Sequence, residues 1–102
     1  MKAIARGLLL AAVAAAAAAQ AGEDLEGFEL ASHCMACHGP AGRSPGAIPA
    51  LNGRDRAFIV ERLRAFRDGT RPSTVMGRLA KGYTDEEIAR IADYIAGLGE
   101  VP

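Results

Sequence analysis

The chain has 102 residues, and its twelve basic residues are balanced by twelve acidic ones. A chain without net positive charge lacks the electrostatic footprint of a nucleic-acid-binding protein. A chain of this length also buries too little apolar surface for a large core. We therefore expect a single small domain that is stabilised by a cofactor or a covalent cross-link.

The first predicted element is a signal peptide over residues 1–21. Lys2 and Arg6 precede an unbroken apolar run, and the segment AQA at positions 19–21 offers a small-x-small cleavage site. The apolar run is shorter than the roughly 18 to 20 residues that a membrane-spanning helix needs, so we expect cleavage and no stable membrane span afterwards. The remaining domain, residues 22–102, keeps ten basic and twelve acidic residues and is expected in the periplasm.

Three helices are predicted in this domain, with Gly/Pro-rich loops between them and no strand. The first helix starts near Asp24 and runs into the first cysteine, and a loop rich in glycine and proline follows it. The second helix spans Asp55–Gly69, with the glycine at its C-terminal cap. The third begins at Thr84, where TDEE is typical of a capping box that includes Glu87. Their apolar stripes are, in chain order, Leu25, Phe28, Leu30 and Ala31; Phe58, Ile59, Leu63 and Phe66; and Ile88, Ile91, Ala92, Ile95 and Leu98.

The chemistry of the chain is concentrated in the segment CMACH, which holds its only two cysteines, Cys34 and Cys37, followed by His38. A structural zinc site needs a second pair of ligands, and a thioredoxin-like dithiol needs a strand-to-helix junction that the pattern lacks. C-x-x-C-H is the attachment motif for haem c, because two thiols one helical turn apart can each bond to one porphyrin vinyl group. We therefore expect one haem c bound covalently through Cys34 and Cys37, with His38 on the iron. A dithiol oxidoreductase is the alternative.

The ligand on the other side of the iron decides the chemistry. Of the three methionines, Met1 lies in the leader and Met35 lies between the cysteines on the His38 side, which leaves Met76. Met76 lies in the loop RPSTVMG, between the second and third helices, which can pass over the far haem face. Ligation by His38 and Met76 favours electron transfer, whereas His38 alone leaves an open position suited to a haem enzyme or gas sensor. A methionine packed only as core filler is the other interpretation of Met76.

The order of these elements resembles class I cytochromes c over essentially all of residues 22–102. The resemblance implies an all-α fold in which three main helices and Gly/Pro-rich loops wrap around one covalently attached haem. In that family a Pro-x-Leu-x-Gly stretch follows the histidine, and PALNG matches it here. By this resemblance the Pro49 carbonyl would accept the Nδ1 proton of His38, and Leu51 would line the haem.

Two further features follow from resemblance. Class I cytochromes c cross their first and last helices through a small residue and an aromatic contact, a role that Gly27, Leu30 and Tyr94 fit. The segments RDGTRP and MGRLAKGYTDEEI also resemble the haem domain of flavocytochrome c sulfide dehydrogenases. In that family the cytochrome subunit takes electrons from a separate FAD-bearing, sulfide-oxidising subunit. Some members carry two haem domains, whereas the single C-x-x-C-H motif here allows one haem.

We therefore expect an electron-transfer protein and not an enzyme, one that passes single electrons between redox protein partners. The expected partner is an FAD-containing sulfide-oxidising subunit, and the alternative is a free soluble shuttle to a terminal oxidase or a reaction centre. No nucleic acid is expected as a partner. Arg71, Arg78 and Lys81 flank Met76, and a basic surface near the haem edge would steer an acidic partner. The arginines of the second helix are expected to form a solvated face.

Overall fold

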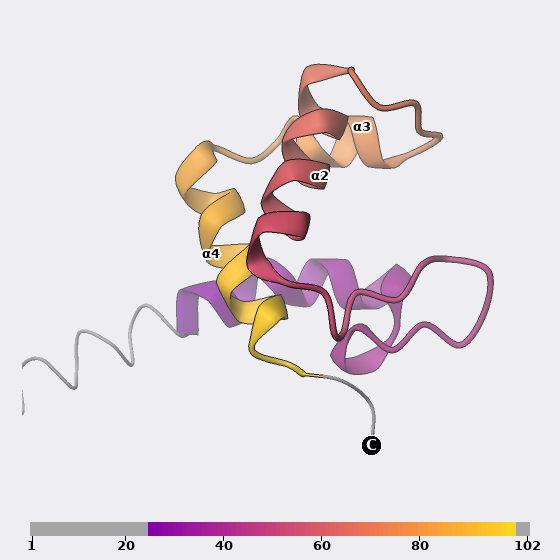
Figure 1. Ribbon diagram of the computed structural model, residues 1–102, viewed down its shortest axis with the longest axis vertical. Coiled ribbons are helices and arrows are strands. Elements are labelled where there is room, and N and C mark those ends of the chain that lie inside the picture. Colours follow the sequence, from indigo (N-terminus) through magenta and orange to yellow (C-terminus); the bar gives the residue numbers. More distant parts are fainter. Residues whose placement is uncertain (1–24, 100–102) are drawn as a thin grey trace, which may run out of the picture.

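The computed structural model describes residues 25–99, which are helical with no strand in that range. The described part of the N-terminal helix covers residues 25–38. It is followed by the 3-10 turn η1 (Pro40–Gly42) and by α2 (Arg56–Asp68), α3 (Met76–Ala80) and α4 (Asp85–Ala96) (Figure 1). The predicted all-α fold is confirmed, whereas the predicted signal peptide lies outside the described residues. No helix in residues 25–99 combines the length and the apolar character needed to cross a membrane.

The ends of α2 and α4 follow the local signals of the sequence. The Asp55 side chain caps α2 by accepting a hydrogen bond from the amide of Phe58, and Gly69 ends the helix in the left-handed conformation. Thr84 and Glu87 form the predicted capping box of α4, in which each side chain accepts from the other residue's amide. Both helices therefore begin where the sequence predicts.

The short helix α3 was not predicted. It begins at Met76, so this residue lies in the first turn of a helix and not within an open loop. The Ser73 hydroxyl accepts a hydrogen bond of 2.8 Å from the amide of Gly77. A Cβ added at Gly77 would lie 3.0 Å from that hydroxyl and 3.5 Å from the Phe66 carbonyl, so α3 packs closely against the last turns of α2. This contact holds the backbone next to Met76 against α2.

The core lies where α2 and α4 meet the N-terminal helix. The apolar stripe of α4 agrees with the prediction, because Ile88, Ile91, Ala92 and Ile95 are fully or almost fully buried. The first helix differs, because Leu25 and Phe28 are 57% and 50% exposed. The buried hydrophobic side chains are Ala31, Ile59, Leu63, Ala80, Ile88, Ile91, Ala92 and Ile95. Such a small core leaves many apolar side chains only partly covered.

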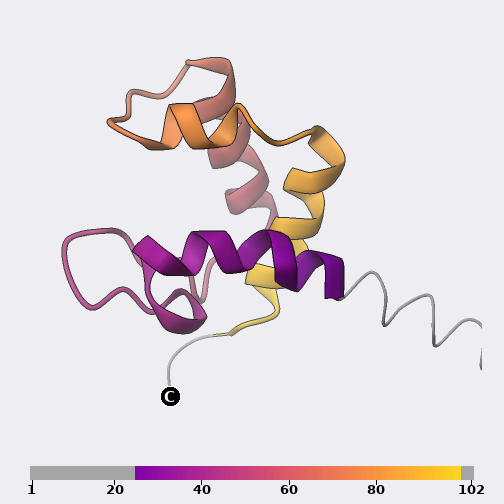
Figure 2. The same cartoon turned by 180° about the vertical axis from the view of Figure 1, so that it is seen from behind.

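The N-terminal helix crosses α4 at Gly27 (Figure 2). A Cβ added at Gly27 would lie 3.3 Å from the Arg90 carbonyl oxygen and 3.5 Å from the Tyr94 Cβ, so the two backbones approach closely. The Phe28 ring meets Tyr94 edge to face, with 5.7 Å between the ring centroids. The predicted crossing of Gly27 against Tyr94 is therefore present, but its aromatic partner is Phe28, while Leu30 packs against the core.

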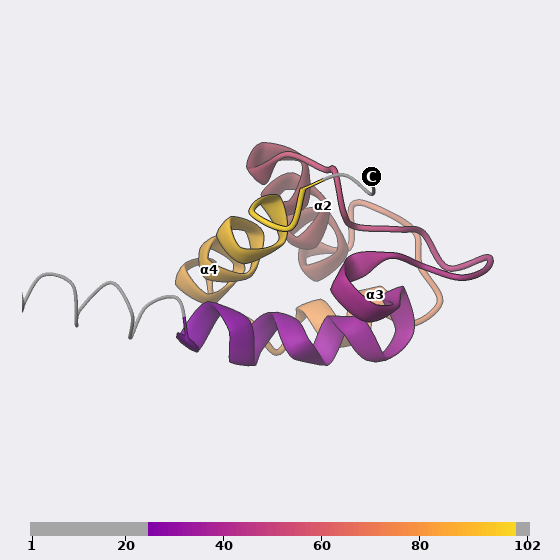
Figure 3. The same ribbon diagram turned by 90° about the horizontal axis from the view of Figure 1, so that it is seen from below.

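The long loop after the motif closes on itself at Gly42. The Gly42 carbonyl accepts hydrogen bonds of 2.8 Å from the amide of Leu51 and 3.2 Å from the amide of Asn52. Gly42 has a φ of 71°, and an added Cβ would lie 3.0 Å from the Asn52 nitrogen. This loop and the loop before α3 both extend to the side of α2 that faces away from α4 (Figures 1 and 3).

We predict that Gly42→Ala lowers the free energy of unfolding by about 1 to 3 kcal/mol, because alanine would have to hold a positive φ and crowd Asn52. Gly46→Ala is the matched control, since Gly46 lies in the same loop with no heavy atom within 4 Å of its added Cβ. Thermal unfolding followed by far-ultraviolet circular dichroism measures both variants. Equal losses in the two proteins would show that Gly42 does not need its conformation.

Candidate functional site

Cys34 and Cys37 lie in the last turns of the N-terminal helix, three residues apart and therefore on one face. Both are free, and Cys34 packs against the core while Cys37 is exposed. Burial raises the pKa of the Cys34 thiol, and a backbone hydrogen bond offsets part of that effect. The Tyr83 hydroxyl behaves similarly: burial raises its pKa, and the negative fields of Cys34 and Glu87 add to the rise. The site thus holds two thiols that share a helix face, one of them beside a neutral phenol.

The helix ends at His38, directly before Gly39, whose φ is 90°. The His38 Nδ1 lies 2.6 Å from the Pro49 carbonyl oxygen. Because a carbonyl can only accept, Nδ1 carries the proton in this contact, which is the tautomer whose lone pair lies on Nε2. Closure of the loop at Gly42 holds the segment of Pro49 in this place. His38 is therefore oriented as a metal ligand through Nε2.

Met76 and Leu51 belong to a group of partly buried apolar side chains around the core. Met76 comes from α3, beside the last turns of α2, whereas the cysteines and His38 come from the N-terminal helix toward the other end of α2 (Figure 1). Members of this group close to the predicted site are Cys34, Met35, Leu51, Phe58, Met76 and Tyr83. The predicted site residues are thus carried by segments that approach α2 from its two ends.

This set of side chains fits a covalently attached haem. Two thiols on one helix face can each form a thioether, and an imidazole nitrogen with a methionine sulfur is the axial pair of electron-transfer haem proteins. Half-buried apolar side chains suit the faces of a porphyrin, since its contact would remove their surface from water. Across residues 25–99 no group of three or more His, Cys, Asp and Glu side chains forms another metal site.

Three residues that shape the site were not singled out from the sequence. Gly39, directly before η1, and Gly42, its last residue, take positive φ values, and the Ser73 hydroxyl accepts from the Gly77 amide next to Met76. Two glycines directly after the motif are a signal of a tight turn, but their role depends on the approach of residues about ten positions further on. Ser73 offers no comparable signal, because many loop serines make no capping bond.

Comparison with known proteins identifies the family. A family profile described as "Cytochrome C oxidase, cbb3-type, subunit III" matches residues 17–95. The chain is 46% identical over 71 residues to the cytochrome subunit of sulfide dehydrogenase from Chlorobaculum tepidum, which covers 70% of this chain. It is 41% identical over 71 residues to the thiosulfate dehydrogenase electron acceptor of Stutzerimonas stutzeri, covering 66% of this chain. It is also 39% identical over 78 residues to cytochrome c-554(548) of Halomonas halodenitrificans, covering 72% of this chain.

The relatives differ in length. The chain spans 64% of the Chlorobaculum subunit and 33% of the Stutzerimonas protein, but 94% of the Halomonas cytochrome. Their names describe cytochromes or an electron acceptor. Given the family match over residues 17–95, the chain belongs to the c-type cytochromes, electron carriers with covalently attached haem c.

Proposed function

We propose that the chain carries single electrons through one haem c that is bonded to Cys34 and Cys37 and ligated by His38 and Met76. The observation that carries this proposal is the 2.6 Å contact between His38 Nδ1 and the Pro49 carbonyl, which leaves Nε2 free for the iron. A methionine sulfur opposite the histidine raises the potential of the iron and closes the position that oxygen or peroxide would need. Leu51 and Met76 also shield the group from water, as their partial burial beside the core supports.

We further propose that residues 1–21 are a cleaved signal peptide and that residues 22–102 form the cytochrome domain in the periplasm. The positive start, the apolar run and the AQA site support cleavage. Covalent attachment of haem in bacteria takes place outside the cytoplasm, so the leader and the C-x-x-C-H motif support each other.

The proposed electron donor is an FAD-containing, sulfide-oxidising subunit. The similarity to the cytochrome subunit of a sulfide dehydrogenase supports this partner, and so do the segments around residues 67–72 and 76–88. A free shuttle between other redox proteins is the second candidate. It is favoured by the Halomonas cytochrome, because this chain covers 94% of that protein's length.

The proposed docking surface surrounds Met76. Arg71, Arg78 and Lys81 are exposed there, and none of them forms an ion pair with a carboxylate of residues 25–99. Val75 and Leu79 are 56% and 52% exposed between these cations. A surface with an apolar centre and a charged rim is typical of a docking site, and the charge suits an acidic partner.

The attachment residues can be tested by mass. We predict that the mature protein, made with a haem-attachment system, has the mass of the chain plus one haem. Cys34→Ala and Cys37→Ala should each lower the haem content, because one thioether is lost. Intact-mass spectrometry and a haem stain after denaturing electrophoresis measure this. A wild-type protein without the added mass would exclude covalent attachment at these residues.

The axial ligand can be tested by spectroscopy. We predict that the ferric protein shows the weak far-red charge-transfer band typical of His/Met ligation, and that Met76→Ala removes the band and lowers the reduction potential. Met35→Leu is the matched control, because Met35 lies between the cysteines, and it should keep the band. A band that survives in Met76→Ala would contradict the assignment of Met76.

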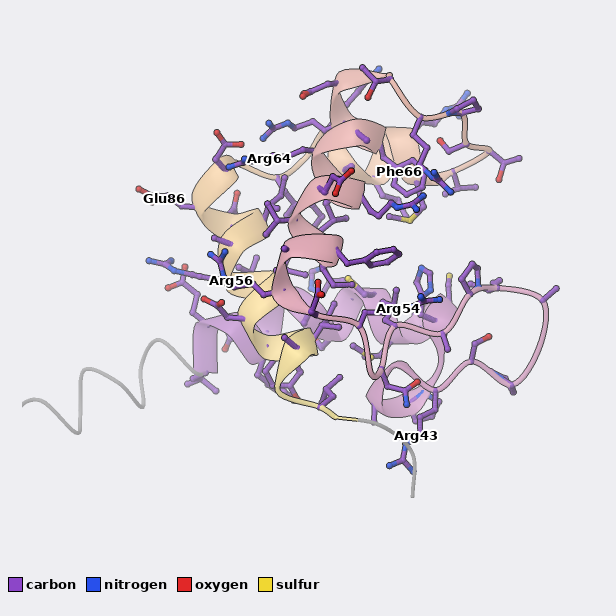
Figure 4. All side chains as sticks on the ribbon, in the orientation of Figure 1. Arg43, Arg54, Arg56, Arg64, Phe66 and Glu86 are labelled. Carbon is purple, nitrogen blue, oxygen red and sulfur yellow. The ribbon has the colours of Figure 1, made fainter. Side chains whose placement is uncertain are left out.

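The docking surface can be tested by kinetics. We predict that reduction by an acidic flavoprotein donor slows as ionic strength rises, and that Arg78→Glu weakens both the rate and its salt dependence. Arg64→Glu is the control with the same charge change, since Arg64 lies toward α4 (Figure 4). Its ion-pair partner Asp85 also pairs with Arg67, and that pair remains in the variant. Stopped-flow reduction across a salt series measures both variants. Identical salt dependences would refute steering by this surface, and failure of any sulfide-oxidising flavoprotein to reduce the protein would favour the free shuttle.

A further inference from the structure

One aromatic side chain of α2 is covered by two arginines. The guanidinium carbon of Arg54 lies 4.8 Å from the centroid of the Phe58 ring, and that of Arg62 lies at the same distance. Arg62 lies one helical turn after Phe58 on α2, whereas Arg54 reaches the ring from the loop that precedes the helix. Two positive charges therefore converge on one ring.

Neither of these two charges belongs to an ion pair among the described residues. Within residues 25–99 neither Arg54 nor Arg62 pairs with a carboxylate, whereas three other arginines of α2 do. A cation over an aromatic face gains only about 0.5 to 1 kcal/mol when exposed, and two like charges close together repel each other. Each guanidinium group is thus available to bind an anionic group.

The arginines lie on the side of α2 that carries the proposed haem ligands. In Figure 4, Arg54 and Phe66 lie on one side of α2, and Arg56 and Arg64 lie on the other, toward α4. The two long loops extend to the side of Arg54 as well (Figures 1 and 3). Phe58 itself packs against the core in the same group as Leu51 and Met76. The unbalanced charges therefore stand at the edge of the haem site.

We propose that Arg54 and Arg62 bind the two propionate carboxylates of the haem, and that Phe58 is the positioning residue that aligns both guanidinium groups. Haem c carries two carboxylates at its rim, which matches two cations on one ring. A guanidinium group can bind a carboxylate through two parallel hydrogen bonds, which is the strongest arrangement available to such a pair. The inference rests on the bound haem and is independent of Met76 as a ligand.

This role has a measurable consequence for the reduction potential. Ferric iron carries one more positive charge than ferrous iron, so it favours ionised propionates, and the potential falls with rising pH wherever a propionate titrates. Two neighbouring guanidinium groups keep the propionates ionised and move that pH interval downward. Without them a propionate holds its proton to higher pH, and the interval moves upward.

The test is a pH series of reduction potentials of the haem-loaded protein. In Arg54→Gln/Arg62→Gln the pH-dependent interval should move upward by about one unit, a tenfold gain in the proton affinity of a propionate. Arg56→Gln/Arg64→Gln is the control with the same change of charge on the same helix, and it should keep the wild-type interval. The haem absorbance of each variant shows that the group is bound.

Redox-difference infrared spectra give a second, direct measurement. A protonated carboxyl band should appear near neutral pH in Arg54→Gln/Arg62→Gln and be absent from the control. If Arg54→Gln/Arg62→Gln yields no haem protein, Arg54→Lys/Arg62→Lys replaces it. The lysines keep both charges but lose the paired hydrogen bonds, so the carboxylate stretching band of the propionates should shift. An unshifted band there would overturn the proposal.

Two further results would also overturn it. The first is a potential profile and an infrared spectrum that are the same in Arg54→Gln/Arg62→Gln and in the control pair. The second is an unchanged profile together with slower reduction by an acidic protein donor, which would assign the two arginines to partner docking.

Discussion

The hydrogen bond between His38 Nδ1 and the Pro49 carbonyl is the interaction on which the site depends most. It joins the end of a helix to the irregular segment around Pro49, and it selects the tautomer in which Nε2 can bind a metal. The loop reaches this position because the Gly42 carbonyl binds the amides of Leu51 and Asn52. A backbone turn thus determines the chemistry of an imidazole ring several residues away.

The arginines of α2 and of the loops beside it fall into two groups that the overall charge conceals. Those that face α4 are bound to aspartates: Arg56 pairs with Asp93, and Arg64 and Arg67 pair with Asp85. The Arg67 guanidinium, which also contacts Asp68, holds the pKa of Asp85 below its usual range. On the side of the two loops the cations instead stack on Phe58 and Phe66. Along α2 and its flanking loops, the cations outside ion pairs therefore lie on the side where the haem site is proposed.

The sequence predicted those features whose causes lie within a few residues. The bounds of α2 and α4 could be predicted because their end signals act inside one helical turn. These signals are the N-cap Asp55, the C-terminal Gly69 and the capping box that begins at Thr84. The spacing of Cys34, Cys37 and His38 is local in the same sense, and it identified the cofactor of the family. The helix crossing of Gly27 and Tyr94 was predicted only through the resemblance to a family, because no local pattern pairs residues so far apart.

Features that depend on distant contacts were missed. The helix α3 is five residues long and is held by Ser73 and by the end of α2, so its own sequence carries little helical signal. The arginines of the second helix were all interpreted as a solvated face, but Arg62 covers Phe58, as does Arg54 from the loop before the helix. The periodic pattern places Phe58 on the apolar stripe, yet it does not show which cations will stack on the ring.

The crossing at Gly27 also bears on the order in which the protein assembles. It joins the helix that carries the cysteines to α4, near the other end of the described chain, so the contact closes a loop of more than sixty residues. Contacts of such long sequence separation are slow to form and come late. A chain that still lacks α4 has only α2 and the loop after the motif against which to dock its first helix. Until the last helix joins them, the thiols of Cys34 and Cys37 are therefore less enclosed than in the folded domain.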